Sequence, residues 1–446
     1  MYQKNDELTL TVSDISIEGH GIAKQDGAVF FCQGLLPGET ARVKIIKTNK
    51  RFLIARPIVI LSESESRIAP ACPVFKRCGG CSLQHLAYPA QLNFKTRRVK
   101  DALLRIGGID VEVQDCAASP KDFNYRNKAM FPVAKVGENL QAGFYAKHSH
   151  DVVDIAACPI QHPLINQAFS LVKVWLKENK ISIYDEKTHK GLVRQIFARV
   201  TAPDALMVGL VATRESIPHI ESLIDALMQI ETLKSVMINV NSSTGNTLLG
   251  DKSLCLYGED TLLHTIDGLN FKVSLNAFLQ VNTDQTESLY RTAMDMADIQ
   301  KTDTVIDLFC GIGTLTLLAA KKAKKVYGIE YVQTATDNAR ENAAANQIGN
   351  AEFICGDCTA LFAETAKKAG TVDVLIVDPP RKGLDVALIS QILKAAPKRM
   401  VYVSCDPGTL ARDLKLLSEK YAIEEVKPFD MFPQTTHVET VVLLEL

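Results

Sequence analysis

Residues 303–314 read DTVIDLFCGIGT, and this stretch decides the fold of the last third of the chain. The apolar run that ends at Phe309 predicts a buried strand, and Gly311 and Gly313 predict a tight turn into a helix. A second predicted strand ends at Glu330, about 20 residues after the turn begins. This is the layout of a nucleotide-binding βαβ unit, in which the acid binds ribose hydroxyls.

The turn does not carry the full three-glycine fingerprint of dinucleotide sites. An adenosine ligand without a pyrophosphate, such as S-adenosylmethionine, therefore fits the turn better than NAD does. A tight turn that holds no ligand is the alternative. The strand before the turn and the acid after it favour the nucleotide site.

Three further predicted strands end at residues whose side chains can bind a ligand or react, namely Asp357, Asp378 and Cys405. Ligands of open α/β sheets bind at the carboxyl ends of parallel strands, so these side chains are expected at one edge. Asp406 and Pro407 suit the cap and first position of a helix that follows. A helix N-terminus would lower the pKa of the Cys405 thiol and favour the thiolate.

Cys405 and the later Glu439 form a candidate catalytic pair. Cysteine is a strong nucleophile near neutral pH, and glutamate is a natural proton acceptor. A thiol that adds to a ring and a base that later removes a proton are what is needed to place a carbon substituent on a pyrimidine. The alternative for Cys405 alone is a buried structural cysteine.

The composition is that of an ordinary globular protein with room for two or three domains. The chain has 446 residues, of which 47% are hydrophobic and 23% charged, and no apolar run reaches membrane-spanning length. Residues 1–7 do not form a signal-peptide pattern, so we expect a cytoplasmic protein with no membrane contact. In that compartment the 11 cysteines are expected to be metal-binding, catalytic or buried rather than paired.

The N-terminal residues 1–61 alternate short β-type segments with turn residues, which predicts a small β-barrel of the OB type. Residues 40–61 contain six basic residues and no acidic one. Clustered positive charge attracts phosphate backbones, so this segment predicts RNA binding, although a solvated basic face would look the same.

Residues 62–275 predict a central α+β domain. Cys72, Cys78 and Cys81 are packed closely enough to indicate a thiolate-ligated metal, either an iron–sulfur cluster or zinc. Cys158 and Cys116 compete for the place of a fourth ligand. A predicted helix over residues 88–105 carries one apolar face, which we expect to pack on the last domain.

Residues 125–128 (YRNK) mix aromatic and basic side chains that could stack bases and hold phosphates. Arg126 and Lys128 are therefore candidate RNA contacts. A packed loop with solvated charges is the alternative.

At this point the sequence resembles a known family. Residues 307–313, 378–381, 404–407 and 436–439 look like the signatures of the RNA uracil-5-methyltransferases, and residues 278–282 resemble the motif at the start of their methyltransferase domain. The cysteine pattern resembles the iron–sulfur cluster of the ribosomal-RNA members, and the N-terminal segment resembles their TRAM domain. Asp406 departs from the family, where Asn is expected more often, and some members carry Asn at the position of Thr314.

The resemblance implies a Rossmann-like class I methyltransferase domain over residues 276–446. It also implies a monomer that methylates C5 of a uridine in RNA, with 23S ribosomal RNA as the favoured substrate. It implies that Cys405 attacks C6 and that Glu439 removes the C5 proton. The implied ligands of a 4Fe-4S cluster are Cys72, Cys78, Cys81 and Cys158. The implied contacts of S-adenosylmethionine are Gln280, Phe309, Thr314, Glu330, Asp357 and Asp378. The implied RNA contacts are Arg126, Lys128 and Arg381, and Asp378 could share in holding the uracil.

Three alternatives stay open. Another methyltransferase acting on an exocyclic amine also uses an acidic Pro-Pro loop, but Arg381 follows here where an aromatic residue is usual. A transfer-RNA uridine-5-methyltransferase is the second alternative, and the added barrel and cysteines favour ribosomal RNA over it. The third, a non-catalytic RNA-binding protein with a relic cofactor fold, is disfavoured by the joint presence of Cys405 and Glu439.

Overall fold

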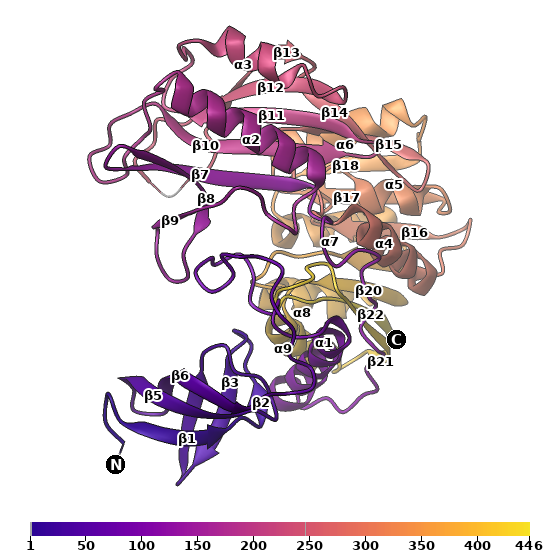
Figure 1. Cartoon of the computed structure of the whole chain (residues 1–446). Helices are drawn as coiled ribbons and strands as arrows, with labels where there is room; N and C mark the ends of the chain where they lie inside the picture. Colours follow the sequence, from indigo (N-terminus) through magenta and orange to yellow (C-terminus); the bar gives the residue numbers. More distant parts are fainter. Residues whose placement is uncertain (1, 246) are drawn as a thin grey trace.

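The computed structural model describes residues 2–245 and 247–446. Figure 1 shows three parts: a small sheet built from the N-terminal strands, a large sheet from the middle of the chain, and an α/β part formed by the last third. None of the described helices is both long and apolar enough to cross a bilayer.

The small sheet has the order β1-β5-β6-β4-β3-β2, with β4 and β6 parallel and its other neighbours antiparallel. Its strands are β1 (Glu7–Thr11), β2 (Asp14–Ile15), β3 (Gly21–Gln25), β4 (Ala28–Cys32), β5 (Thr40–Thr48) and β6 (Leu53–Ser62). The Ser13 N–H donates to the Ile22 carbonyl at 2.8 Å and so joins the end of β1 to β3. Apolar side chains such as Phe30 and Val43 fill the interior.

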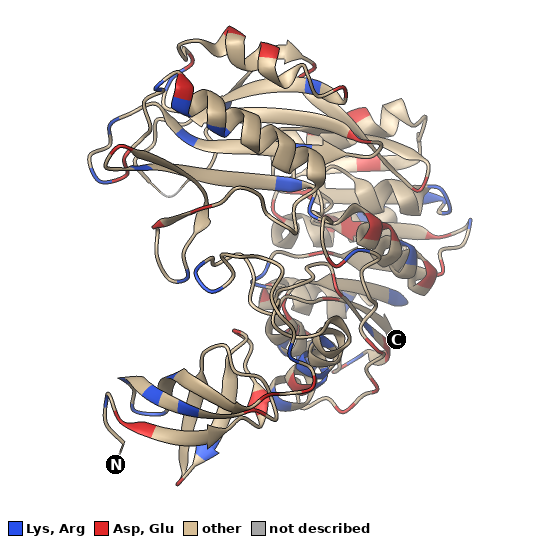
Figure 2. Ribbon diagram, in the orientation of Figure 1, with Lys and Arg blue, Asp and Glu red and all other residues tan. Residues whose placement is uncertain are grey.

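The small sheet is more regular than the sequence pattern predicted. Strands β2 and β3 were not expected, because a two-residue strand and a segment with Gly21 give weak β signals. Strand β6 continues to Ser62, where a linker was expected to begin. In Figure 2 the ribbon of β5 and β6 carries several positions coloured as Lys or Arg. The basic residues of this region form no ion pair within the described chain; they are Arg42, Lys44, Lys47, Lys50, Arg51 and Arg56.

The predicted helix over residues 88–105 is α1 (Tyr88–Ala102), with a proline in its first turn and a π-helical turn η1 (Leu103–Gly107) after it. It packs as expected on the last part of the chain, through Val99 and Leu103. The backbones come close together at Gly107, where an added Cβ would lie 3.0 Å from the Ala411 carbonyl oxygen. A residue without a side chain is therefore needed at this contact.

The middle of the chain forms a seven-stranded sheet of order β13-β12-β11-β10-β7-β8-β9, in which only β11 and β12 run parallel. Its strands are β7 (Lys128–Val136), β8 (Asn139–Tyr145), β9 (Val152–Asp154), β10 (Val193–Thr201), β11 (Ala205–Ala212), β12 (Leu233–Val240) and β13 (Lys252–Gly258). Helices α2 (Pro163–Glu178) and α3 (Ile220–Leu227) cover one face (Figure 1). This region is thus one continuous sheet rather than an irregular mixture.

A two-stranded hairpin, β14 (Thr261–Ile266) and β15 (Leu269–Ser274), joins this sheet to the last part. On one side, Leu262 packs with Phe197 of the large sheet. On the other, the Lys272 N–H donates to the Asn342 side chain at 2.8 Å. The hairpin therefore holds the two parts together.

The last third forms a seven-stranded sheet of order β18-β17-β16-β19-β20-β22-β21. Its strands are β16 (Thr304–Leu308), β17 (Lys325–Glu330), β18 (Ala351–Cys355), β19 (Val374–Val377), β20 (Arg399–Ser404), β21 (Ala422–Phe429) and β22 (Glu439–Glu445). Its helices are α4 (Thr283–Ala297), α5 (Thr314–Ala320), α6 (Gln333–Ala345), α7 (Cys358–Ala369), α8 (Val386–Ala395) and α9 (Pro407–Leu417).

Strands β16 to β20 are parallel, as predicted, and β22 is antiparallel to both of its neighbours. Successive residues of a strand face opposite sides of the sheet. Val305 and Ile306 accordingly enter two separate apolar clusters, one under each layer of helices. The strands are apolar on both faces because both faces are covered.

Candidate active site

The glycine turn after β16 has the sharp geometry that the sequence predicted. Phe309 has φ 65°, a region that bulky residues rarely occupy, and such strain concentrates at functional turns. Gly313 has φ 86° and caps α5; a Cβ there would lie 3.0 Å from the Phe353 ring. At Gly311 nothing lies within 4 Å of an added Cβ, so the space beside the turn is open to a ligand.

Glu330 lies at this turn, as expected of the acid after the second strand. Its carboxylate accepts the Gly311 N–H at 3.0 Å and the Val332 N–H at 2.9 Å. The acid therefore joins the end of β17 to the glycine turn. Thr314 begins α5 directly behind the turn, and Asp357 caps α7 by accepting the Ala360 N–H at 3.0 Å.

Asp307 is a buried acid that the sequence argument did not single out. It lies in β16, is 1% exposed and accepts the Thr316 hydroxyl at 2.5 Å. Burial raises its pKa to about 7, despite that hydrogen bond. An acid within an apolar strand was the available signal, because such a residue is rarely buried without a role.

Gln280 is buried in the segment that leads into α4, next to residues from the central sheet. The Asn127 side chain donates to the Gln280 carbonyl at 3.1 Å, and the Asn127 N–H donates to Val281 at 2.8 Å. Asn282 caps α4 and donates to the Ser119 hydroxyl at 3.0 Å. Asn127 and Asn282 were missed in the sequence, because their partners are far away along the chain.

Cys405 follows β20 and is partly exposed, at the edge predicted for it. Asp406 caps α9, since its carboxylate accepts the Gly408 and Thr409 N–H groups at 2.9 Å each. The capping interpretation of Asp406 is thus confirmed. This carboxylate takes up the N-terminal N–H groups that would otherwise favour a thiolate.

The expected lowering of the Cys405 pKa is wrong for this structure. Burial and, to a smaller extent, the carboxyls of Glu439 and Asp378 together raise the pKa of the thiol to about 12. Arg381 acts in the opposite direction but does not outweigh them. A buried thiol between two acids resists taking on negative charge.

Glu439 begins β22 and is 3% exposed. Burial raises its pKa to about 8, with a further contribution from Asp378, whereas Arg381 lowers it. Burial also raises the pKa of Asp378 to about 7. The structure therefore brings Cys405, Glu439, Asp378 and Arg381 together, from three separate stretches of the sequence.

Arg126 and Lys128 lie at the start of β7, beside the segment that carries Gln280. Burial lowers the pKa of Lys128 to about 7, and the guanidinium groups of Arg199 and Arg126 lower it further. The Lys128 ammonium lies 5.7 Å from the centre of the Phe197 ring. Within the described chain neither residue, nor Arg381, forms an ion pair with a carboxylate.

In residues 2–245 and 247–446, no three His, Cys, Asp or Glu side chains lie close enough together to hold a single metal ion. The four candidate thiols nevertheless face one another. Burial raises the pKa of Cys81 to about 12, and the charges of Cys158, Cys78 and Cys72 raise it further. Cys116 is not among them and lies beside Lys95 and Asp430.

Thiolates are ligands of both iron–sulfur clusters and structural zinc, so the chemistry of these four side chains suits either group. Backbone N–H groups already point at the sulfurs, as at Cys78, whose sulfur accepts the Gly80 N–H at 3.4 Å. At Cys158 the Gln161 N–H donates to the backbone carbonyl, at 3.1 Å.

Comparison with known proteins agrees with this geometry. Residues 87–446 match the tRNA (uracil-5-)-methyltransferase family, and residues 3–58 match the TRAM domain. The chain is 41% identical to an uncharacterized RNA methyltransferase of Clostridium tetani, covering 99% of this chain and 97% of that protein. It is 42% identical to one of Listeria monocytogenes, covering 100% and 99%.

A solved structure is similar over almost the whole chain. It is the Pyrococcus abyssi tRNA (uracil-54, C5)-methyltransferase in complex with S-adenosyl-L-homocysteine, with a TM-score of 0.79 and 27% identity over 98% of this chain and 100% of that one. The last part of the chain thus has a methyltransferase fold, and a TRAM domain precedes it. This chain belongs to the tRNA (uracil-5-)-methyltransferase family and is an S-adenosylmethionine-dependent RNA uracil-5-methyltransferase.

Proposed function

We propose that this enzyme methylates C5 of a specific uridine in 23S ribosomal RNA through a covalent bond between Cys405 and C6. The observation that carries the chemistry is the meeting of Cys405, Glu439 and Asp378, where the two acids raise the pKa of the thiol. Methylation of an exocyclic amine needs no thiol and no separate base of this kind. The arrangement therefore supports chemistry on the ring.

The target uridine leaves its stack, because its ring atoms are otherwise covered. The Cys405 thiolate forms a bond to C6, and the electrons of the C5–C6 double bond move to the ring carbonyl at C4. C5 then takes the methyl group, leaving S-adenosylhomocysteine. Glu439 removes the proton from C5, the double bond re-forms, and the thiolate leaves C6.

The bound cofactor supplies a positively charged sulfonium as well as the methyl group. A positive charge near Asp378, Glu439 and Cys405 stabilises their ionised forms and opposes the pKa rise that burial causes. These three groups therefore ionise more readily when S-adenosylmethionine is bound. The side chains that we propose to contact the cofactor are Gln280, Phe309, Thr314, Glu330, Asp357 and Asp378.

We further propose three parts with separate tasks: residues 1–61 bind RNA, residues 62–275 carry a 4Fe-4S cluster, and residues 276–446 bind S-adenosylmethionine and carry out the chemistry in a monomer. Cys72, Cys78, Cys81 and Cys158 would hold the cluster, which fixes the loop beside β8. Arg126, Lys128 and Arg381 carry positive charge without a carboxylate partner in the described chain, which suits phosphate or uracil contacts.

Two RNA classes compete as substrates. The barrel with its basic face and the four facing thiols favour ribosomal RNA, through their resemblance to the ribosomal-RNA members. The similarity in fold to a transfer-RNA enzyme favours transfer RNA. We expect 23S ribosomal RNA from cells that lack this protein to miss 5-methyluridine at one or more positions, and its transfer RNA to be unchanged. Mapping of 5-methyluridine in both RNA fractions measures this, and loss confined to transfer RNA would reverse the choice.

The roles of Cys405 and Glu439 separate in a denaturing gel with labelled RNA. Cys405→Ala should abolish methylation and give no protein–RNA band. Glu439→Gln should still add the thiol and transfer the methyl group, and then stall with a covalent band because the C5 proton stays in place. RNA with 5-fluorouridine should trap the unmutated enzyme in the same way. Methylation by Cys405→Ala would disprove the nucleophile assignment.

The buried base gives a pH-dependent stability. The raised pKa of Glu439 favours its neutral form in the fold, so this contribution is complete below about pH 4 and is lost as the pH rises through about 8. Glu439→Gln removes this loss of stability at high pH, because glutamine does not ionise. Its free energy of unfolding should match that of the unmutated protein near pH 5 and exceed it above pH 8, by roughly 1.4 kcal/mol for each unit of the shift at most.

Urea unfolding between pH 5 and pH 9 measures this difference. Glu419→Gln is the matched control, because Glu419 is exposed just beyond α9. A difference that stays constant across the pH range would show that Glu439 is not a buried acid.

Anaerobically purified protein should be brown and contain about four irons and four sulfides per chain. Cys158→Ser should lower the iron content and change the visible spectrum, whereas Cys255→Ser should not, because Cys255 is exposed on β13 away from the four thiols. Stoichiometric zinc without iron, in protein never exposed to air, would refute the cluster.

A further inference from the structure

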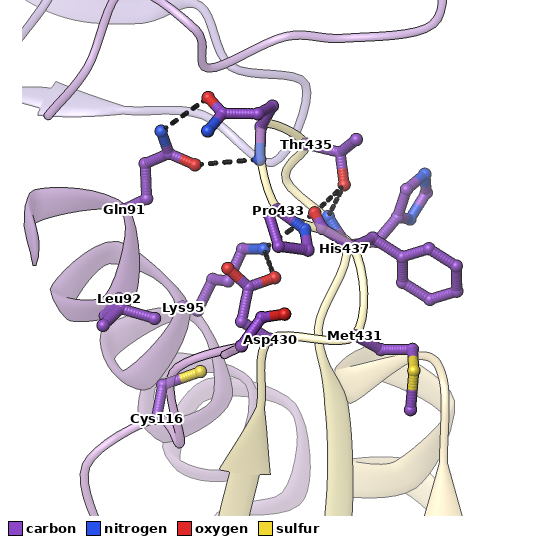
Figure 3. Close-up of polar contacts among 12 residues, drawn as sticks. Gln91, Leu92, Lys95, Cys116, Asp430, Met431, Pro433, Thr435 and His437 are labelled. Atoms are coloured by element: carbon purple, nitrogen blue, oxygen red, sulfur yellow. Dashed lines mark hydrogen bonds and ion pairs between the residues drawn. The ribbon is translucent and has the colours of Figure 1, made fainter. Parts of the chain in front are cut away.

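Helix α1 lies outside the catalytic sheet, yet three of its polar side chains form hydrogen bonds with the loop that leads to Glu439. Gln91, Lys95 and Arg98 are spaced by four and three residues, so they share one face of the helix. All three bond to the loop of residues 430–438, which connects β21 to β22. Figure 3 shows the bonds of Gln91 and Lys95. We name residues 430–438 the base loop, because they lead directly to Glu439 at the start of β22.

Gln91 and Gln434 bond reciprocally. The Gln91 amide donates to the Gln434 side-chain oxygen at 3.0 Å and accepts the Gln434 N–H at 3.0 Å (Figure 3). Gln434 has φ 69°, which a residue with a side chain adopts only when its surroundings impose it. The Ser82 and Leu83 N–H groups donate to the carbonyl of the same residue at 3.0 Å each.

Lys95 and Asp430 form an ion pair in which both side chains are fully buried. Lys95 also donates to the Phe432 carbonyl at 3.1 Å. Removing one partner of such a pair leaves an uncompensated charge in the interior, which is strongly destabilising. The pair therefore holds the start of the base loop on α1 but is poorly suited to a functional test.

Arg98 lies between the turn that carries Cys405 and the base loop that leads to Glu439. Its guanidinium donates to the Thr436 carbonyl in the base loop, three residues before Glu439. Asp406 lines the same groove as Arg98, and its charge opposes the lowering of the Arg98 pKa by burial. Asp406 directly follows Cys405, so Arg98 is bonded to the loop of the base and lies near the turn of the nucleophile.

We propose that Arg98 is a positioning residue that sets Glu439 against the substrate held by Cys405. The turn of Cys405 has its own support, because Asp406 caps α9 with two hydrogen bonds. Arg98 holds the C-terminal end of the base loop on α1, in addition to the pairing of Glu439 with Phe429 in the sheet. Loss of Arg98 therefore slows removal of the C5 proton and leaves addition of the thiol nearly unchanged. This inference rests on the proposed covalent mechanism.

The test follows the covalent adduct in time. Unmutated enzyme, Arg98→Ala and Arg98→Lys are mixed with S-adenosylmethionine and 23S ribosomal RNA from cells lacking the protein, and samples are denatured at intervals. Arg98→Ala should form the adduct at the unmutated rate and release it about ten- to a hundredfold more slowly, the worth of a hydrogen bond from a charged group. Arg98→Lys should fall between the two.

Added guanidinium ion should speed release in Arg98→Ala, because Arg98 borders an open groove of about 440 Å³ between α1 and the small sheet. Lys100→Ala is the control, since Lys100 is exposed on the same helix and should leave both rates unchanged. Thermal melting and RNA affinity, measured for all variants, exclude unfolding and a direct RNA contact as the cause.

Equal slowing of adduct formation and release would overturn the inference, as would release at the unmutated rate. A loss of RNA affinity in Arg98→Ala would instead make Arg98 an RNA contact and would also overturn it. If the unmutated enzyme forms no adduct even with 5-fluorouridine RNA, the covalent mechanism itself fails, which is a separate result.

Discussion

The position of Glu439 in the site depends on the direction of strand β22. Strands β16 to β20 are parallel, so their carboxyl ends, with Glu330, Asp378 and Cys405, meet at one edge of the sheet. Strand β22 is antiparallel to β20 and therefore begins at that same edge. Ser404 pairs with Thr440, which sets Glu439 beside the turn of Cys405. A parallel last strand would have placed its first residue at the far edge.

The crowding of acids at this edge is costly to the empty protein. Asp378, Glu439 and the Cys405 thiol all have raised pKa values, because burial disfavours their charged forms and nearby carboxyls add to the rise at Cys405 and Glu439. Within the described chain, Arg381 is the cation whose charge lowers the pKa of both Cys405 and Glu439. Such clusters of perturbed groups are typical of functional sites, where ligand charge completes the balance.

The elements outside the catalytic sheet contribute structure to the site. Asn127, from the central sheet, bonds to the segment of Gln280, and α1 bonds to the loop before Glu439. The hairpin β14–β15 fixes the central sheet to α6. The three parts of the chain thus act as one frame around the cofactor edge, which explains why the fold similarity to the Pyrococcus abyssi enzyme extends over the full length.

The sequence by itself determined the elements whose signals are local. The apolar run and glycines of residues 303–314 predicted β16, the turn and α5, and Asp406 with Pro407 predicted the start of α9. These features were found as predicted because a strand, a turn and a cap depend on neighbouring residues. The carboxyl-edge placement of Asp378 and Cys405 followed from the same alternation of strands and helices.

Only the tertiary structure decided what depends on distant partners. Lys95 and Asp430 are 335 residues apart, and no local pattern indicates that they form a buried pair. The same holds for Asn127 and Gln280, 153 residues apart. The pKa of Cys405 was predicted in the wrong direction, because the helix N-terminus is visible in the sequence whereas burial and the nearby Glu439 are not. Strands, turns and caps depend on adjacent residues, but desolvation and through-space charge are properties of the folded chain.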